Sequence, residues 1–266
     1  MRKGKFFFVL LLPIHLSKVE KYFGINYEFD KSIVYDTIDT IAQTGGKGYV
    51  CVADGVTLSM SQNYSLLKEV LDNANIVTCD SGWVPVFLRW IYGINREQLS
   101  GSELFSSIIH KKKYKMIFLG ASNAILKPLR ENISQIDPDI LDMQFVSLPF
   151  RPVEAFDYDK ISTLINEENP DIVWVALGMP KQELFMSNLM PYLNRGVCIG
   201  VGAAFKFFSG LSGHRRAPEW MIKCKIEWVH RIFSEPKKQI GRCWLIFKTI
   251  PKLLYKENKI KKNKDV

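Results

Sequence analysis

An aspartate directly after a strand-like run is a candidate for a functional side chain in this chain. Asp80 follows the apolar run 75–79 and precedes Ser81 and Gly82. Open α/β sheets place functional side chains at this point, just beyond the carboxyl end of a strand. The alternative interpretation is an N-cap for the helix that begins at Trp83, because aspartate caps helices well.

Two glycine-containing turns could hold phosphate groups. Residues 120–123 and 178–182 each follow a strand-like run and lead into a predicted helix. Small residues let a backbone approach a phosphate, and the first N–H groups of a helix attract anions. In the segment 178–182, Lys181 lies in the first turn of the predicted helix, where its positive charge opposes the helix dipole. Binding of an anion would explain a lysine at this position; a solvated surface lysine is the alternative. Neither turn matches a dinucleotide fingerprint or a P-loop.

A longer segment, residues 171–235, combines two such strand ends with a basic helix. Its apolar runs 171–177 and 197–201 both end at glycines, and the second run leads into residues 202–205. Arginines and tryptophans follow in residues 215–231. This arrangement suits a phosphorylated ligand, because glycine turns and cationic side chains both favour anions.

Short apolar strands alternate with helices through the first 200 residues. The predicted strands are residues 6–12, 49–53, 75–79, 115–119, 143–148, 171–177 and 197–201, and the predicted helices include 31–43, 64–71, 83–92, 124–132 and 158–166. The strands are continuous apolar runs, so helices should cover both faces of the sheet. The sequence therefore predicts an α/β fold with a mostly parallel sheet, which gathers ligands at the carboxyl ends of its strands.

The excess positive charge is confined to the tail. Residues 211–266 contain 15 Lys/Arg and 5 Asp/Glu, a net charge of +10, whereas the first 210 residues contain 21 basic and 22 acidic residues, a net charge of −1. This distribution disfavours a general nucleic-acid binder and predicts a tail that binds phosphate groups or an acidic membrane. We therefore divide the chain into a catalytic core, residues 1–210, and a basic amphipathic helical appendage, residues 211–266.

Apolar and basic side chains recur at helical spacing along this tail. Trp220, Cys224, Trp228 and Ile232 are spaced by four residues, and a second segment, 244–255, carries aromatic, aliphatic and lysine residues. A helix packed on the core and a helix at a membrane interface both fit this pattern.

Several other functional classes find little support. The chain has five cysteines, an odd number, and no two of them lie at metal-ligand spacing. We interpret them as reduced thiols. The aspartate pair 137/139 precedes a strand, at its amino end, and the pair 157/159 starts a helix, where aspartates are expected as caps, so we predict neither a metal nor another cofactor. The apolar run 6–12 is interpreted as a strand; a membrane-contacting segment or an export signal is the alternative. No stretch of the sequence reaches the length of a membrane-spanning helix.

Taken together, the motifs resemble the WecG/TagA/CpsF glycosyltransferases. The resemblance covers about residues 24–242, and it is carried by residues 75–80, 99–105, 118–121, 176–183, 200–205 and 216–236. It implies a Rossmann-like core and an appendage that closes the site. It also implies a bacterial enzyme that works as a peripheral protein at the cytoplasmic face of the membrane, without a metal.

The implied reaction is an inverting transfer of a sugar in cell-surface polysaccharide or teichoic-acid-type biosynthesis. The donor would be a UDP-sugar carrying N-acetylmannosamine, its uronate or glucose, and the acceptor a sugar on undecaprenyl diphosphate. A homo-oligomer is compatible with the sequence, and no nucleic-acid partner is expected. A Rossmann-like nucleotide-binding protein without turnover is the alternative function.

The resemblance also assigns roles to residues. Asp80 matches the family's proposed base, Gln182 its active-site glutamine, and Arg216 and Arg231 its diphosphate-facing arginines. The residues expected to bind the substrate or UDP are Asp54, Gly120, Gly178, Lys181, Gln182, Gly202 and Phe205. The chain departs from the family's Thr-x-Asn at residues 51–53, which Asp54 follows, and from its Gly-Gly-x-Phe-Asp, where Lys206 replaces the acid.

Overall fold

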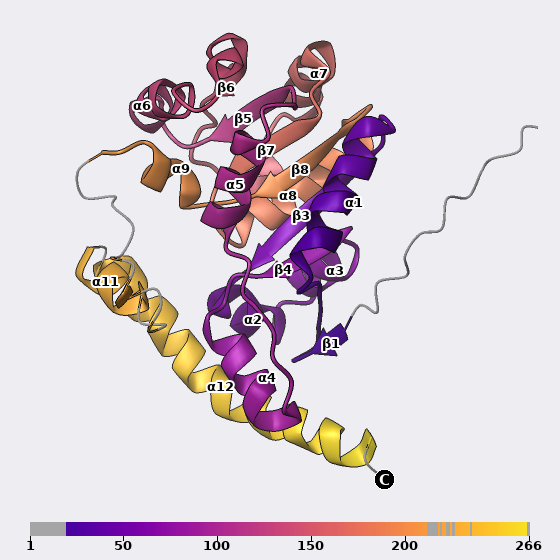
Figure 1. Ribbon diagram of the computed structural model, residues 1–266, viewed down its shortest axis with the longest axis vertical. Helices are drawn as coiled ribbons and strands as arrows, with labels where there is room; N and C mark the ends of the chain where they lie inside the picture. Colours follow the sequence, from indigo (N-terminus) through magenta and orange to yellow (C-terminus); the bar gives the residue numbers. More distant parts are fainter. Residues whose placement is uncertain are drawn as a thin grey trace, which may run out of the picture.

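The core of the protein is a six-stranded sheet in which all neighbouring strands are parallel (Figure 1). The computed structural model describes residues 20–211, 218, 220–221, 224, 227–234 and 236–264. The strand order is β4-β3-β8-β7-β5-β6. The strands are β3 (Lys47–Ala53), β4 (Ile76–Cys79), β5 (Met116–Gly120), β6 (Gln144–Val146), β7 (Ile172–Ala176) and β8 (Gly196–Gly200). The predicted α/β fold is confirmed.

Helices cover both faces of this sheet, as the continuous apolar strands predict. The helices are α1 (Lys31–Gln43), α2 (Gly55–Ser61), α3 (Ser65–Asp72), α4 (Trp83–Tyr92), α5 (Gly101–His110), α6 (Asn123–Ile133), α7 (Tyr158–Glu168), α8 (Lys181–Leu189) and α9 (Ala204–Phe208). Short 3₁₀ segments are η1 (Pro138–Asp142), η2 (Val153–Ala155) and η3 (Met190–Tyr192). Along β7, Val173 and Val175 belong to the core cluster that contains residues of α3, α4, α7 and α8, whereas Ile172 and Trp174 belong to the cluster that contains residues of α1, α5, α6 and α9.

Several elements were not anticipated from the sequence. A small antiparallel hairpin, β1 (Glu20–Tyr22) and β2 (Ile25–Tyr27), precedes α1. Helix α5 is capped by Ser100, whose hydroxyl accepts from the Glu103 N–H at 3.2 Å. This Ser-x-x-Glu spacing is a recognisable helix-start signal. The predicted strand at residues 6–12 lies outside the described residues.

The C-terminal segment forms two helices, α11 (Glu227–Ser234) and the 29-residue α12 (Pro236–Lys264). Helix α12 runs across α2 and α4 and packs on both of them (Figure 1). Its Glu257 is buried and accepts hydrogen bonds from the Phe23 N–H and from the Tyr92 hydroxyl, each at 2.8 Å. A buried carboxylate with two such donors fixes the helix to the hairpin and to α4.

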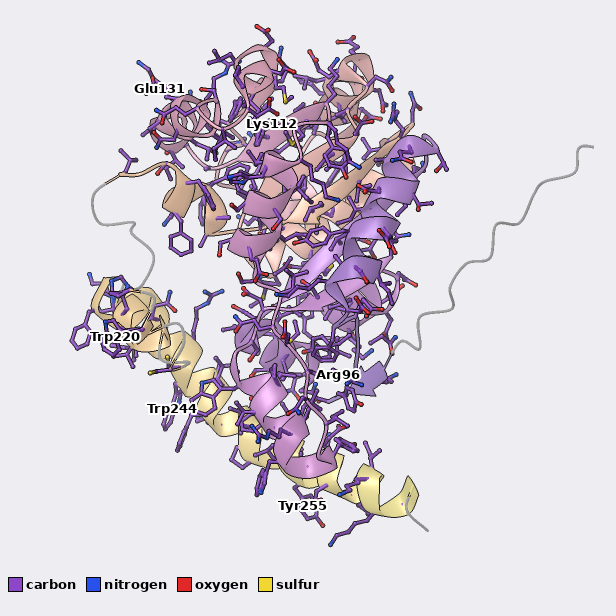
Figure 2. All side chains as sticks on the ribbon, in the orientation of Figure 1. Arg96, Lys112, Glu131, Trp220, Trp244 and Tyr255 are labelled. Carbon is purple, nitrogen blue, oxygen red and sulfur yellow. The ribbon has the colours of Figure 1, made fainter. Side chains whose placement is uncertain are left out.

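The opposite face of α12 is apolar and exposed. Its side chains follow helical spacing: Ile240, Trp244, Phe247, Pro251 and Tyr255. Figure 2 shows Trp244 and Tyr255 on the side of α12 that faces away from the sheet. Phe233 is also exposed. Trp220 and Cys224, the first two residues of the predicted four-residue spacing in the tail, are exposed as well, so packing on the core was wrong for these two residues. Within the described part of the chain, no helix is both long and apolar enough to cross a membrane.

Candidate active site

The carboxyl ends of β3 and β4 bring Asp54 and Asp80 to one edge of the sheet. The two strands are in register with Ala53 opposite Cys79, and the Asp80 N–H donates to the Ala53 carbonyl at 2.9 Å. The Asp80 carbonyl accepts from the Gln98 amide at 2.9 Å. These contacts fix the backbone of Asp80 while its side chain remains partly exposed.

Asp80 does not act as the cap of α4. The residue at the N-cap position is Gly82, two residues after Asp80. The capping alternative for Asp80 was therefore wrong.

Asp54 has a structural contact and an electrostatic one. Its Oδ1 caps α2, accepting from the N–H groups of Val56 (2.9 Å) and Thr57 (2.8 Å) and from the Thr57 hydroxyl (3.0 Å). Its Oδ2 lies 3.9 Å from the Arg242 guanidinium of α12. The cap hydrogen bonds to α2 fix the Asp54 side chain. Its carboxylate therefore places a fixed negative charge beside the end of β3, next to Arg242.

Arg242 is the basic residue that the sequence did not single out. Helix α12 approaches α2 so closely that a Cβ at Gly55 would lie 3.2 Å from Ile246 of α12. The same Cβ would lie 3.9 Å from the hydroxyl of Ser81, the residue after Asp80. This packing brings Arg242 to the strand ends that carry Asp54 and Asp80. Of the two arginines expected here, Arg216 lies outside the described residues. Arg231 belongs to α11, and its side chain is also not described.

Gln182 lies under the end of β8, in the first turn of α8. Its N–H donates to the Gly178 carbonyl at 3.0 Å, and its side-chain amide donates to Glu183 at 3.0 Å. A Cβ on Gly200 would lie 3.0 Å from Gln182 Nε2, and one on Gly202 would lie 3.3 Å from Oε1. The two glycines therefore leave the space that the carboxamide occupies. Within the described residues, Gln182 Oε1 is buried without a hydrogen-bond partner.

Glu183 is a fully buried carboxyl group next to this amide. Burial raises its pKa from the ordinary 4.5 to about 7, and the hydrogen bond from Gln182 partly offsets this. The charge of Asp54 raises the pKa further and that of Arg242 lowers it. Among the described residues, Glu183 Oε2 has no hydrogen-bond partner. No functional role was predicted for Glu183 from the sequence.

The raised pKa of Glu183 predicts a pH-dependent cost in stability. Between pH 4.5 and about 7 the unfolded chain releases this proton while the folded protein retains it, so the free energy of unfolding falls as pH rises. Above this window the loss is complete, at about 3 kcal/mol. Glu183→Gln should remove it, so the variant gains stability over the wild type between about pH 5 and about pH 8.

Urea unfolding at several pH values measures this difference. Glu131→Gln is the matched control, because Glu131 is exposed on α6 and its charge is solvated in both states. The control should keep the wild-type pH dependence. Identical pH dependence for Glu183→Gln and the wild type would contradict the predicted cost.

The remaining candidates lie along the ends of β5, β7 and β8. Gly178 has a φ of 76° with open space around its Cβ position, whereas a Cβ at Gly120 would lie 2.8 Å from the Ala176 carbonyl. Packing therefore accounts for Gly120, and its contact with a ligand stays a prediction. Lys181 Nζ lies 4.1 Å from the centroid of the Phe150 ring, which is 99% exposed. The Lys181 ammonium is thus held at the rim of the sheet by a cation–π contact.

Phe205 is part of the core in this structure. It is fully buried, with its ring centroid 5.8 Å from that of Phe105 and 6.0 Å from that of Phe118. It supports the turn between β8 and α9 from below, and its contact with UDP stays a prediction. Along the carboxyl ends of the strands lie a candidate base, Asp80 after β4, the cationic Arg242 beside Asp54 after β3, and Lys181 after β7.

Comparison with known proteins adds a family and named relatives. The model of the "Glycosyl transferase WecG/TagA/CpsF family" matches residues 22–264. The N-acetylglucosaminyldiphosphoundecaprenol N-acetyl-beta-D-mannosaminyltransferase of Bacillus subtilis (strain 168) is 29% identical over 201 residues, 74% of this chain and 73% of that protein. The protein of the same name from Staphylococcus aureus (strain MW2) is 24% identical over 252 residues, 90% of this chain and 94% of that protein.

Proposed function

The chain belongs to the WecG/TagA/CpsF family of glycosyltransferases, and from this membership we propose that it transfers N-acetylmannosamine from a UDP-linked donor to N-acetylglucosaminyl-diphosphoundecaprenol. Both quoted relatives are named for this N-acetyl-beta-D-mannosaminyl transfer. Their names give no support to the uronate or to glucose as the donor sugar. A nucleotide-binding protein without turnover is disfavoured, because both relatives are named as transferases.

The observation that carries the mechanism is the position of Asp80. Its backbone is fixed at the carboxyl end of β4, where open α/β sheets place functional side chains, and the residue is partly exposed. In the proposed reaction, Asp80 accepts the proton of the acceptor hydroxyl as that oxygen attacks the anomeric carbon. The bond between this carbon and the UDP oxygen breaks on the opposite face, so the configuration inverts.

The departing UDP gains negative charge, which cationic and N–H groups would stabilise. The open turn at Gly178 and the N-terminal end of α8 support a diphosphate position there. Lys181 reaches this rim from α8, and Arg242 reaches the neighbouring strand ends from α12. We assign Arg216 and Arg231 to the same task, on the family pattern alone.

The exposed face of α12 supports a position at the cytoplasmic face of the membrane. The apolar row from Ile240 to Tyr255 is accompanied by the exposed lysines Lys248, Lys252, Lys256 and Lys259. Aromatic side chains favour the headgroup region, and lysines attract anionic lipids. A lipid-linked acceptor requires such a position, because its isoprenoid chain stays in the bilayer. In this proposal residues 211–266 act as the membrane-binding appendage.

A donor screen tests the proposed activity. The full chain is mixed with acceptor-containing vesicles and separately with UDP-N-acetylmannosamine, its uronate and UDP-glucose, and UDP release is measured. We expect acceptor-dependent release with UDP-N-acetylmannosamine and little with the other two. Release with the uronate or glucose alone would overturn the donor assignment, and no release with any donor would overturn the transferase mechanism.

A further inference from the structure

Helix α4 exposes an apolar stripe that the catalytic account leaves unexplained. Trp83, Val86 and Trp90 recur at i, i+3 and i+7 and are 43%, 43% and 75% exposed. The other side of this helix, at Val84, Leu88 and Ile91, is buried in the core. Large exposed apolar patches mark interaction surfaces.

The stripe lies between the candidate base and the appendage. Trp83 is only three residues after Asp80 in the chain. At the other end of the helix, the Tyr92 hydroxyl donates to Glu257 of α12, and α12 packs along α4. Trp83 and Trp90 are separated by about 10 Å along the helix axis, at about 1.5 Å per residue. The surface of α4 therefore connects the catalytic strand end to the helix that we propose for membrane binding.

Charge on and around α4 favours an anionic partner. The sequence of α4, Trp83–Tyr92, contains no acidic residue and one exposed basic residue, Arg89. The adjoining α12 adds the exposed lysines Lys252, Lys256 and Lys259. Tryptophan is the side chain that most favours the boundary between lipid headgroups and acyl chains, and nearby cations add attraction to anionic lipids.

We propose that the Trp83–Val86–Trp90 stripe of α4 inserts into the interface of an anionic bilayer, and so sets the height of Asp80 above the lipid-linked acceptor. This inference rests on the proposed function and adds a second membrane contact to that of α12. A second copy of this chain is the competing occupant. The bilayer is favoured because the stripe adjoins Asp80, where a reacting acceptor enters with its lipid attached.

The test compares Trp83→Ala/Trp90→Ala with the wild type, using the full chain. Co-sedimentation with vesicles of phosphatidylglycerol and phosphatidylcholine measures membrane affinity. Turnover is measured with a vesicle-embedded acceptor and with a short-chain, water-soluble acceptor. Each lost tryptophan should weaken vesicle binding by about tenfold. Turnover should fall on the embedded acceptor and stay near normal on the soluble one.

Leu141→Ala is the matched control, because Leu141 is an exposed apolar residue of η1, before the amino-terminal end of β6. It should leave vesicle binding unchanged. Normal turnover on the soluble acceptor also establishes that the double variant is folded. Trp83→Phe/Trp90→Phe should retain most of the vesicle binding, because it keeps two large apolar side chains on the stripe. Comparison with the alanine variant then distinguishes loss of the membrane contact from loss of the fold.

Three results would overturn the inference while leaving the proposed function intact. One is wild-type vesicle affinity in the double alanine variant. Another is an equal loss of turnover on both acceptors. The third is a loss of self-association in sedimentation without a loss of vesicle binding, which would assign the stripe to a second copy. Failure of the proposed function differs from all of these, because the wild type would then transfer sugar to neither acceptor.

Discussion

Replacing Asp80 with asparagine is expected to slow sugar transfer by about 100- to 10,000-fold, the range for losing a general base. Asparagine has nearly the same shape but cannot accept the proton of the acceptor hydroxyl. The backbone contacts of residue 80 with Ala53 and Gln98 use main-chain atoms, so the fold should be retained. UDP-sugar binding should also be retained, because the proposed diphosphate position lies at α8.

Turnover and UDP-sugar affinity are measured in parallel to separate these effects. Asp157→Asn is the matched control: Asp157 caps α7 by accepting from the Lys160 N–H at 3.0 Å, and asparagine caps nearly as well. The control should transfer sugar at close to the wild-type rate. Near-normal transfer by Asp80→Asn would remove Asp80 as the base.

Removing residues 236–266 is expected to abolish transfer and vesicle binding together. The truncation removes Arg242 from the site and the exposed apolar row from the surface. It also leaves the Phe23 N–H and the Tyr92 hydroxyl without their buried acceptor, Glu257. Losing one acceptor of this kind costs about 1–3 kcal/mol, so some loss of stability should accompany the loss of function.

Point variants separate the two functions of α12. Arg242→Ala should lower turnover by at least about tenfold, since a charge beside the reacting groups is lost, and should keep vesicle binding. Lys237→Ala removes one charge from an exposed position of the same helix and should leave turnover unchanged. A truncated chain that still binds vesicles and transfers sugar would contradict the proposed function of the appendage.

The sequence predicted those parts of the fold that local patterns determine. Helices α1 and α4 begin and end at the expected residues, because apolar spacing and flanking glycines define them. The parallel sheet followed from continuous apolar strands, which require cover on both faces. Helix α2 was missed because it is short and starts directly after a strand, so Asp54 was interpreted as a ligand-binding residue after that strand and not as a helix cap.

The site was only partly predictable, because its parts meet through tertiary packing. Asp80 and Gly178 were predicted because each follows a strand, where ligands collect, whereas the role of Gln182 was predicted from the family resemblance. Arg242 was missed because its position depends on the path of α12 across α2, which no local pattern encodes. The buried carboxyl of Glu183 was missed for a similar reason: a glutamate in a first helical turn is usually explained by the helix dipole. The domain boundary at residue 210 stays a prediction.

The most direct test of the central claim is detection of the transferred sugar on the lipid. Purified full-length protein is incubated with UDP-N-acetylmannosamine and vesicles that contain N-acetylglucosaminyl-diphosphoundecaprenol, and the lipids are analysed by mass spectrometry and NMR. We predict one added N-acetylhexosamine per acceptor, a β linkage, and release of one UDP for each sugar transferred. UDP release without the disaccharide lipid, or no reaction at all, would contradict the account.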